Sequence, residues 1–416
     1  METARRIARR YGDVAVCLAV FFVCYLPRDR VFPPANQWVI DLEIYRAGGE
    51  LVAKGINPYD YARGKAVRDE IYTFHRKTLG WGFPTSVDMW NYYASGNLPL
   101  NLWFFGLIYK INPSPTAFRA VFHVADALVG VLAFLLIRFR WGSSSRRAAF
   151  LLAVLLSLNG AFLKWGTTYP EDKGIETLLF FATLALMVPN RNSWPRLVGV
   201  AVLAAAAISF KMLGIFLVPA VLVWAYRERG RRGLIVVAAV VGGLCLAVNA
   251  AYLPWMLKLW RDRMGSNTGG PIHCSIWILP YGWWPWLAKI KAPATLSLLG
   301  TAVAAVQVYR RKLSLEVFGG IVTYLFCVVY LVGGSIDRVT MGVMAIVATL
   351  GIQRPSWGLL TLALWTAAGV GIYFVGGEDT EGMLVLYASI IAFFALVTGT
   401  LKTWPFAPAL PHHTSS

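Results

Sequence analysis

The chain has 416 residues, of which 57% are hydrophobic and only 14% are charged. A soluble domain would carry roughly 25% charged residues, so this composition excludes a soluble cytosolic enzyme, a disordered tail and a disulfide scaffold. The net charge of +18 does not indicate a nucleic-acid partner, because the basic residues form short clusters between apolar runs, as in cytoplasmic loops of membrane proteins. We therefore predict an all-α polytopic membrane protein that contacts membrane lipids and no nucleic acid.

Apolar runs long enough to cross a bilayer, roughly 17–25 residues each, predict about twelve transmembrane helices. They lie near residues 12–27, 116–137, 148–163, 174–189, 197–210, 212–226, 233–253, 292–309, 315–333, 339–352, 357–375 and 383–401. No small-residue cleavage site follows the first run, so we expect an uncleaved first span. Placing every arginine-rich turn in the cytoplasm puts both termini inside.

The segment 97–112 is apolar enough to be a further span. Counting it as one would move the arginine cluster of residues 138–147 to the outer side, against the positive-inside rule. We therefore predict that residues 97–112 form a re-entrant or interfacial piece on the outer side of the membrane.

This topology contains two long outer segments. We predict a cytoplasmic N-terminus with the first span (1–27), an outer loop with amphipathic helices and the re-entrant piece (28–115), a transmembrane core (116–253), a second outer loop (254–291), C-terminal transmembrane helices (292–401) and a cytoplasmic tail (402–416). The first outer loop is far longer than an ordinary connection, which indicates a functional role.

Residues 40–54 in this loop are expected to form a short helix along the membrane surface. Gly55 can end the helix, and Pro58 prevents its continuation. Asp41 opens it, and an Asp in this position is a good N-cap. Partial desolvation at the membrane–water boundary would equally suit a carboxylate to act as a general base, so both roles stay open.

The run from Asp41 to Tyr59, DLEIYRAGGELVAKGINPY, resembles the "D-x-x-x-Y … G-x-N-P-Y" signature that follows the first span of GT-C glycosyltransferases. It is similar to that of the bacterial polyprenyl-phosphate-mannose-dependent α-mannosyltransferases. Weaker similarity extends through roughly the first 290 residues, including the tripeptide that ends at Lys211 and the outer loop with His273 and Ser275. The last hundred residues or so contain no matching motif.

The resemblance implies a GT-C fold with Asp41 as the catalytic base. Asp41 would take the proton of an acceptor hydroxyl as its oxygen attacks the anomeric carbon, and polyprenyl phosphate would leave from the opposite face, so configuration inverts. Glu43 and Tyr45 would bind substrate beside it. An Asp-x-Glu pair can ligate a divalent cation, but two carboxylates seldom make a dedicated site, so we expect no metal and no other cofactor.

The leaving phosphate gains negative charge and requires cations or hydrogen-bond donors. Lys211 falls at the outer corner between two apolar runs, where it either binds this phosphate or extends its ammonium group to the lipid headgroups. The related mannosyltransferases use a loop histidine near the donor phosphate, which implies His273 as a catalytic residue, with Ser275 beside it as a substrate contact.

A charged segment between two apolar runs contains Glu171, Asp172 and Lys173. Lys173 is a candidate phosphate contact, and the two acids are candidate contacts of acceptor hydroxyls. A solvated turn in which Asp172 caps the following helix is an equally good interpretation.

The sequence thus predicts a glycosyltransferase that moves a sugar, expected to be mannose, from polyprenyl phosphate to a hydroxyl of a lipid-linked or cell-envelope glycan. The expected place is the extracytoplasmic side of a bacterial plasma membrane. Two alternatives remain: a transporter or flippase, which would place charges in mid-span as at Asp126, and a polymerase- or ligase-type enzyme with a lipid-diphosphate donor. The sugar, acceptor and linkage are not determined by the sequence.

Overall fold

A computed structural model describes the residues that follow: 2–30, 40–60, 65–67, 69–70, 72–73, 97–141, 146–158, 160–163, 166–167, 171–187, 193–258, 284–286, 292–310 and 313–325. These ranges consist of helices, turns and short connections and contain no β-strand. The prediction of an all-α protein is therefore confirmed for this part of the chain.

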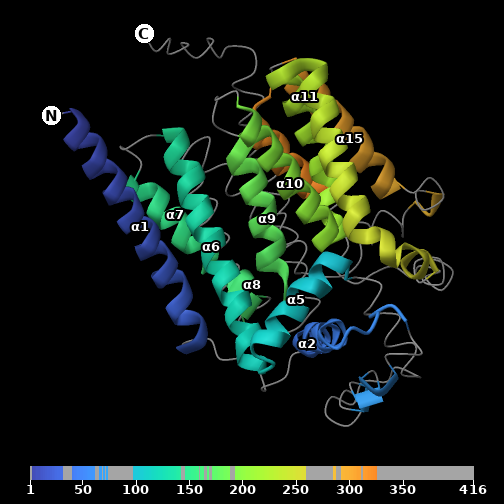
Figure 1. The fold of residues 1–416 in the computed structure, drawn as a ribbon. Coiled ribbons are helices and arrows are strands. Elements are labelled where there is room, and N and C mark those ends of the chain that lie inside the picture. Colours follow the sequence, from blue (N-terminus) through green and yellow to red (C-terminus); the bar gives the residue numbers. More distant parts are fainter. Residues whose placement is uncertain are drawn as a thin grey trace.

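A bundle of helices forms most of the described structure (Figure 1). In chain order it contains α1 (Glu2–Arg30), α6 (Pro115–Trp141), α7 (Arg146–Ser157), α8 (Gly160–Leu163), α9 (Lys173–Met187), α10 (Trp194–Phe210), α11 (Val218–Asn249), α15 (Ala292–Tyr309) and α16 (Leu315–Tyr324). Two further helices, α2 (Ile40–Ala53) and α5 (Pro99–Ile111), lie together at one end of the bundle.

Three helical stretches are long and apolar enough to cross a membrane: Tyr11–Arg28, Pro115–Arg138 and Val218–Lys258. Shorter apolar helices occur at Trp194–Phe210 and Thr295–Tyr309. These stretches support a membrane protein, whereas the predicted number of twelve spans is not shown. The predicted spans 339–352, 357–375 and 383–401 lie outside the described residues.

The helix α11 folds back on itself at a basic turn. Arg229 and Gly230 leave helical geometry, and Gly230 has a φ of 59° that favours glycine. Both ends of α11 therefore lie beside the C-terminal end of α10: the Asn249 Nδ2 donates to Ser209 Oγ at 3.3 Å, and the chain enters α11 through the short 3-10 helix η4 (Met212–Leu217) that follows α10. The predicted apolar runs 212–226 and 233–253 form the two arms of this hairpin.

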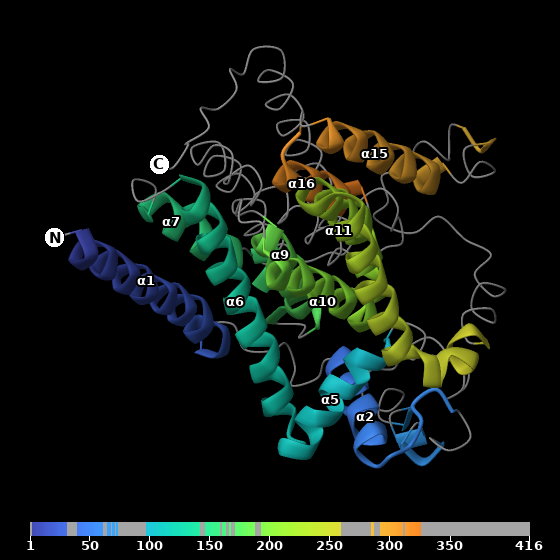
Figure 2. The same ribbon diagram turned by 45° about the horizontal axis from the view of Figure 1, so that its top comes forward.

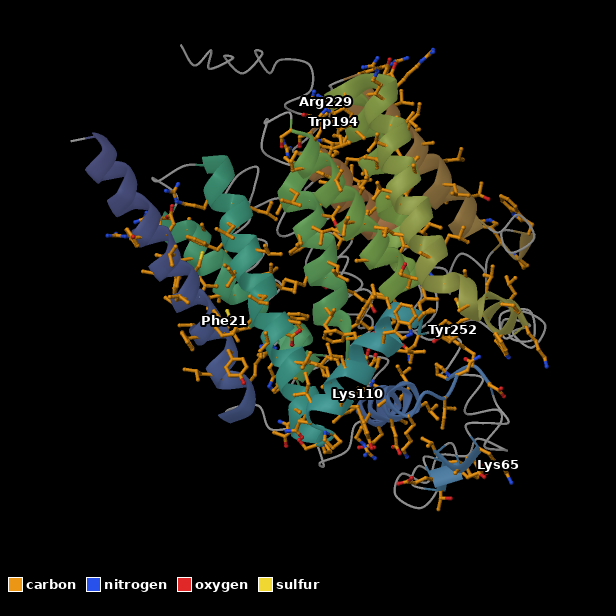
Figure 3. The ribbon with its side chains drawn as sticks, in the orientation of Figure 1. Phe21, Lys65, Lys110, Trp194, Arg229 and Tyr252 are labelled. Carbon is orange, nitrogen blue, oxygen red and sulfur yellow. The ribbon has the colours of Figure 1, made fainter. Side chains whose placement is uncertain are left out.

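The arginine-rich turns lie at the same end of the bundle. Asp13 of α1 forms ion pairs with Arg138 at 3.1 Å and Arg146 at 2.8 Å, which joins α1 to the α6–α7 turn. The Arg229 guanidinium lies 5.1 Å above the Trp194 ring, and Figure 3 shows both residues at the end opposite Lys110 and Tyr252. The bundle thus has one basic end, as the positive-inside rule requires of cytoplasmic turns.

The helices α2 and α5 pack closely because glycines face their contact. A Cβ atom on Gly49 would lie 2.5 Å from the Phe105 carbonyl oxygen, and one on Gly106 would lie 2.7 Å from Val52 Cγ1. Figure 2 shows α2 and α5 side by side near the end of α10. With 13 residues, α5 is about 20 Å long, shorter than the roughly 30 Å hydrocarbon core of a bilayer. A helix of this length is compatible with the predicted interfacial piece.

The end of α2 follows the sequence prediction. Gly55 has a φ of 70°, the Ile56 N–H donates to the Leu51 carbonyl at 2.8 Å, and the Gly55 N–H donates to the Val52 carbonyl at 3.0 Å. This is the Schellman arrangement that satisfies the last carbonyl groups of a helix. The Tyr59 hydroxyl then donates to the Asn97 carbonyl at 2.7 Å, which joins the segment after α2 to the start of α5.

An aromatic core connects α2 and α5 to the bundle. The Tyr45 ring lies 4.7 Å from that of Phe105 and 5.4 Å from that of Phe122. Phe118 and Phe210 belong to the same buried cluster. Aromatic packing of this kind adds to the free energy of area burial, and it fixes Tyr45 against α5, α6 and the end of α10.

Candidate functional site

Lys211 and two carboxylates form a buried ion cluster at the end of the bundle away from the arginine-rich turns. The Lys211 Nζ lies 2.5 Å from Asp172 Oδ1 and 2.6 Å from Glu176 Oε1. Its side chain is 14% exposed, whereas that of Asp172 is fully buried. Of these three side chains, that of Lys211 is thus the most exposed.

A second lysine enters the cluster from the start of α9. The Lys173 Nζ lies 3.9 Å from Glu176 Oε1 and 3.5 Å from Glu171 Oε2. Two ammonium groups therefore approach the same oxygen of Glu176. When all five groups are ionised, the cluster carries three negative and two positive charges, so the carboxylates fully neutralise the lysines.

The helices α2 and α5 contribute polar groups that bind the Asp172 carboxylate. The Asn101 Nδ2 donates to Asp172 Oδ2 at 2.8 Å, and the Tyr45 hydroxyl also hydrogen bonds to Asp172. Asp172 thereby joins four elements: α2, α5, the start of α9 and the end of α10. Glycine-mediated packing of α2 on α5 sets the positions of Tyr45 and Asn101 together.

The electrostatic surroundings keep Asp172 ionised. Burial alone would raise the pKa of Asp172, but Lys211, Lys173 and the hydrogen bonds from Lys211 and Tyr45 outweigh it and lower the pKa below the ordinary value. A carboxylate with a lowered pKa is a weak proton acceptor. Asp172 therefore suits the role of holding the cations in place better than that of a general base.

The backbone explains how Lys211 reaches this cluster. Lys211 is the C-cap of α10 with an extended conformation, φ −149° and ψ 137°, and η4 follows it at once. At the tight corner a Cβ atom on Gly214 would lie 2.3 Å from the Ala207 carbonyl carbon. The corner holds the lysine at the end of α10, where its side chain meets the start of α9.

The predicted site residues fall into three groups. The structure brings together Tyr45, Glu171, Asp172, Lys173 and Lys211. Glu43 forms an ion pair with Arg46 at 2.8 Å on α2 itself. Since i and i+2 positions of a helix point about 200° apart, Glu43 lies on a different face of α2 from Tyr45.

Asp41, His273 and Ser275 are not tested by the structure. The backbone of Asp41 belongs to the first turn of α2, but its side chain is outside the described part of the chain. Helical spacing places residue 41 on the same face as Tyr45, about 6 Å along the axis. His273 and Ser275 lie outside the described residues, so their roles stay predictions.

Two members of the cluster were not expected from the sequence. Asn101 is a buried amide in the otherwise apolar stretch 98–108, and that polar residue was the available signal. Glu176 comes one turn after Asp172 on α9, a spacing that places both carboxylates on one face. Within the described residues, no group of three His, Cys, Asp or Glu side chains is arranged to hold a metal ion.

Residues 97–255 match the model of a protein family described as dolichyl-phosphate-mannose-protein mannosyltransferase. The matched region contains Asn101, Asp172 and Lys211 and leaves out α2. The match supports, at a coarse level, a membrane glycosyltransferase of the GT-C type. No curated protein matches the chain at a significant level.

Proposed function

We propose that this chain is an inverting glycosyltransferase that transfers mannose from polyprenyl phosphate to a hydroxyl of a lipid-linked or cell-envelope glycan. The observation that carries the proposal is the pair of lysines, Lys173 and Lys211, which converge on one carboxylate oxygen at 3.9 and 2.6 Å. The pair lies within the region that matches the mannosyltransferase family. We place the reaction on the extracytoplasmic side of a bacterial plasma membrane.

In this proposal the lysines bind the donor phosphate. The acceptor oxygen attacks the anomeric carbon, the bond from that carbon to the phosphate oxygen breaks, and the hydroxyl proton passes to the Asp41 carboxylate. The phosphomonoester that leaves carries more charge than the diester, so cations nearby stabilise the transition state. Lys211, which is the more exposed lysine, meets the phosphate first, and Asp172 and Glu176 hold it in position beforehand.

The remaining predicted residues take supporting roles. Tyr45 and Asp172 orient the cluster, Glu171 is placed to accept hydrogen bonds from sugar hydroxyls, and His273 with Ser275 would approach the donor phosphate from the second outer loop. Glu43 acts as a substrate contact only if its pair with Arg46 opens. The reaction as proposed uses no metal ion.

A transfer assay with purified protein in lipid vesicles tests this function. The donors would be short-chain polyprenyl phosphates linked to mannose, galactose or arabinofuranose, with a lipid-diphosphate sugar as the comparison and each reaction run with and without EDTA. We expect transfer of mannose by the wild type with EDTA present and none by Asp41→Asn. Transfer only from the lipid-diphosphate donor, or binding of none of the donors by folded protein, would refute the proposal.

A further inference from the structure

A second buried ion pair connects the end of α1 to α6. The Arg28 Nη1 lies 3.0 Å from Asp126 Oδ2, and both side chains are fully buried. Arg28 also donates to Thr167 Oγ1 and to the Ser157 carbonyl, both at 2.5 Å, and the Ser157 hydroxyl donates to the Asp126 carbonyl at 3.0 Å. The Arg28 guanidinium thereby connects α1 with α6, with α7 and with the segment before α9.

The carboxylate of Asp126 lies directly against the first turn of α9. A Cβ atom on Gly174 would lie 1.9 Å from Asp126 Oδ1, and one on Gly166 would lie 2.7 Å from Asp126 Oδ2. Gly174 follows Lys173 immediately and belongs to the same helical turn as Glu176. The position of Asp126 therefore limits where the residues of the ion cluster can sit.

We propose that Arg28 and Asp126 are positioning residues that hold the first turn of α9 in register with Lys211. A fully buried ion pair is generally no more stabilising than well-packed apolar residues of similar volume, so stability alone gives little reason for one here. The contact of the Asp126 carboxylate with the α9 backbone gives a reason for the ion pair. A shift of this turn would move Lys173 and Asp172 relative to Lys211. The kinetic part of this inference rests on the proposed function.

Two variants separate positioning from a simple loss of charge. The double variant Arg28→Met/Asp126→Leu removes both charges at once and leaves neither unpaired, and Gly174→Ala forces Asp126 and α9 apart while all charges stay. The matched control is Asp13→Asn, which breaks the α1 ion pairs with Arg138 and Arg146 at the other end of the same helices.

The first measurement does not depend on enzymatic activity. Amine acylation of Lys211 in folded protein, quantified by mass spectrometry, should be faster than in the wild type for both test variants, because displacement of α9 separates Lys211 from its carboxylates. Asp13→Asn should leave the rate unchanged. Wild-type acylation rates in both test variants would overturn the positioning role.

The second measurement is the rate of sugar transfer by the same proteins. Misplacement of a reacting group by about 1 Å lowers rates up to roughly 100-fold, so we expect kcat to fall about 10- to 100-fold in both test variants, with a much smaller change in the donor KM. Unchanged kcat in both would also overturn the inference. If acylation changes as expected but even the wild type transfers no sugar, the proposed function fails and the positioning role stands.

Discussion

At the scale of single residues, Lys211 forms ion pairs with both Asp172 and Glu176, at 2.5 and 2.6 Å. Replacement by Met leaves two buried carboxylates with only Lys173 for compensation, and removal of one partner from a buried pair is destabilising by about 3 kcal/mol. We expect Lys211→Met to lower the unfolding temperature and to weaken binding of a short-chain polyprenyl phosphate, measured by tryptophan fluorescence. Lys211→Arg keeps the positive charge and should retain most of the wild-type stability. An equal fall in unfolding temperature in Lys211→Met and Lys211→Arg would contradict this prediction.

Asp172 gives a prediction about pH. Its pKa is lowered below the ordinary 3.8, so its ionised form contributes stability that is fully present above pH 3.8 and is lost as pH falls through the lower folded-state pKa. The loss of stability in Asp172→Asn should therefore be the same at pH 5 and pH 8, as measured by thermal unfolding in detergent. A stability loss that differs between these two pH values would contradict this prediction.

At the scale of helices, the contact of α2 with α5 determines whether Tyr45 and Asn101 meet Asp172. Gly49 allows this contact, because an added Cβ would lie 2.5 Å from a backbone oxygen that cannot rotate away. We expect Gly49→Ala to separate the helices and to lower sugar transfer. Gly199→Ala on α10, whose Cβ would make an ordinary 3.4 Å contact with Leu186, serves as the control and should behave as the wild type.

The C-terminal end of α2 is open to a second test. Gly55 has a positive φ, and a residue with a Cβ atom is destabilised there by about 1–2 kcal/mol. Gly55→Ala should therefore lower the unfolding temperature of the purified protein. Gly243→Ala within α11 has free space around the added methyl group and should leave that temperature unchanged or raise it slightly.

At the scale of the whole molecule, the arginine-rich turns and the ion cluster occupy opposite ends of the bundle. If the basic end is cytoplasmic, a cysteine in place of exposed Lys54 should react with a membrane-impermeant maleimide in intact cells, in a background without the native cysteines. A cysteine in place of Arg231 should react only after the cells are opened. The reverse pattern would invert the topology and place the ion cluster in the cytoplasm.

The end of α2 and the turn within α11 follow from local sequence, and this is why both could be predicted. Gly55 ends α2, and the turn at Arg229 and Gly230 separates two apolar arms, because both features depend on a few neighbouring residues. The ion cluster could be predicted from the sequence only in part. Lys211 could be identified as a charge between apolar runs, whereas its partners come from distant segments.

The buried ion pairs show most clearly what cannot be predicted from local sequence. Asp126 could be recognised as an isolated acid in an apolar run, but its partner Arg28 lies 98 positions away, and periodicity contains no information about that distance. Asn101 is similar, since an amide within an apolar helix predicts a polar neighbour without specifying which one. Such contacts depend on how whole helices pack, and that is determined by shape and volume across the bundle.

The ion cluster also has a consequence for the order of synthesis. Tyr45 and Asn101 leave the ribosome well before Asp172 and Lys211. If the ion cluster faces the extracytoplasmic side, as proposed, α2 and α5 cross the membrane before their polar partners have been made. The nascent chain must therefore keep two polar groups hydrated until α10 has been inserted and the corner at Lys211 has formed. A chain that stops before residue 211 would leave Asp172 and Glu176 without their principal cation.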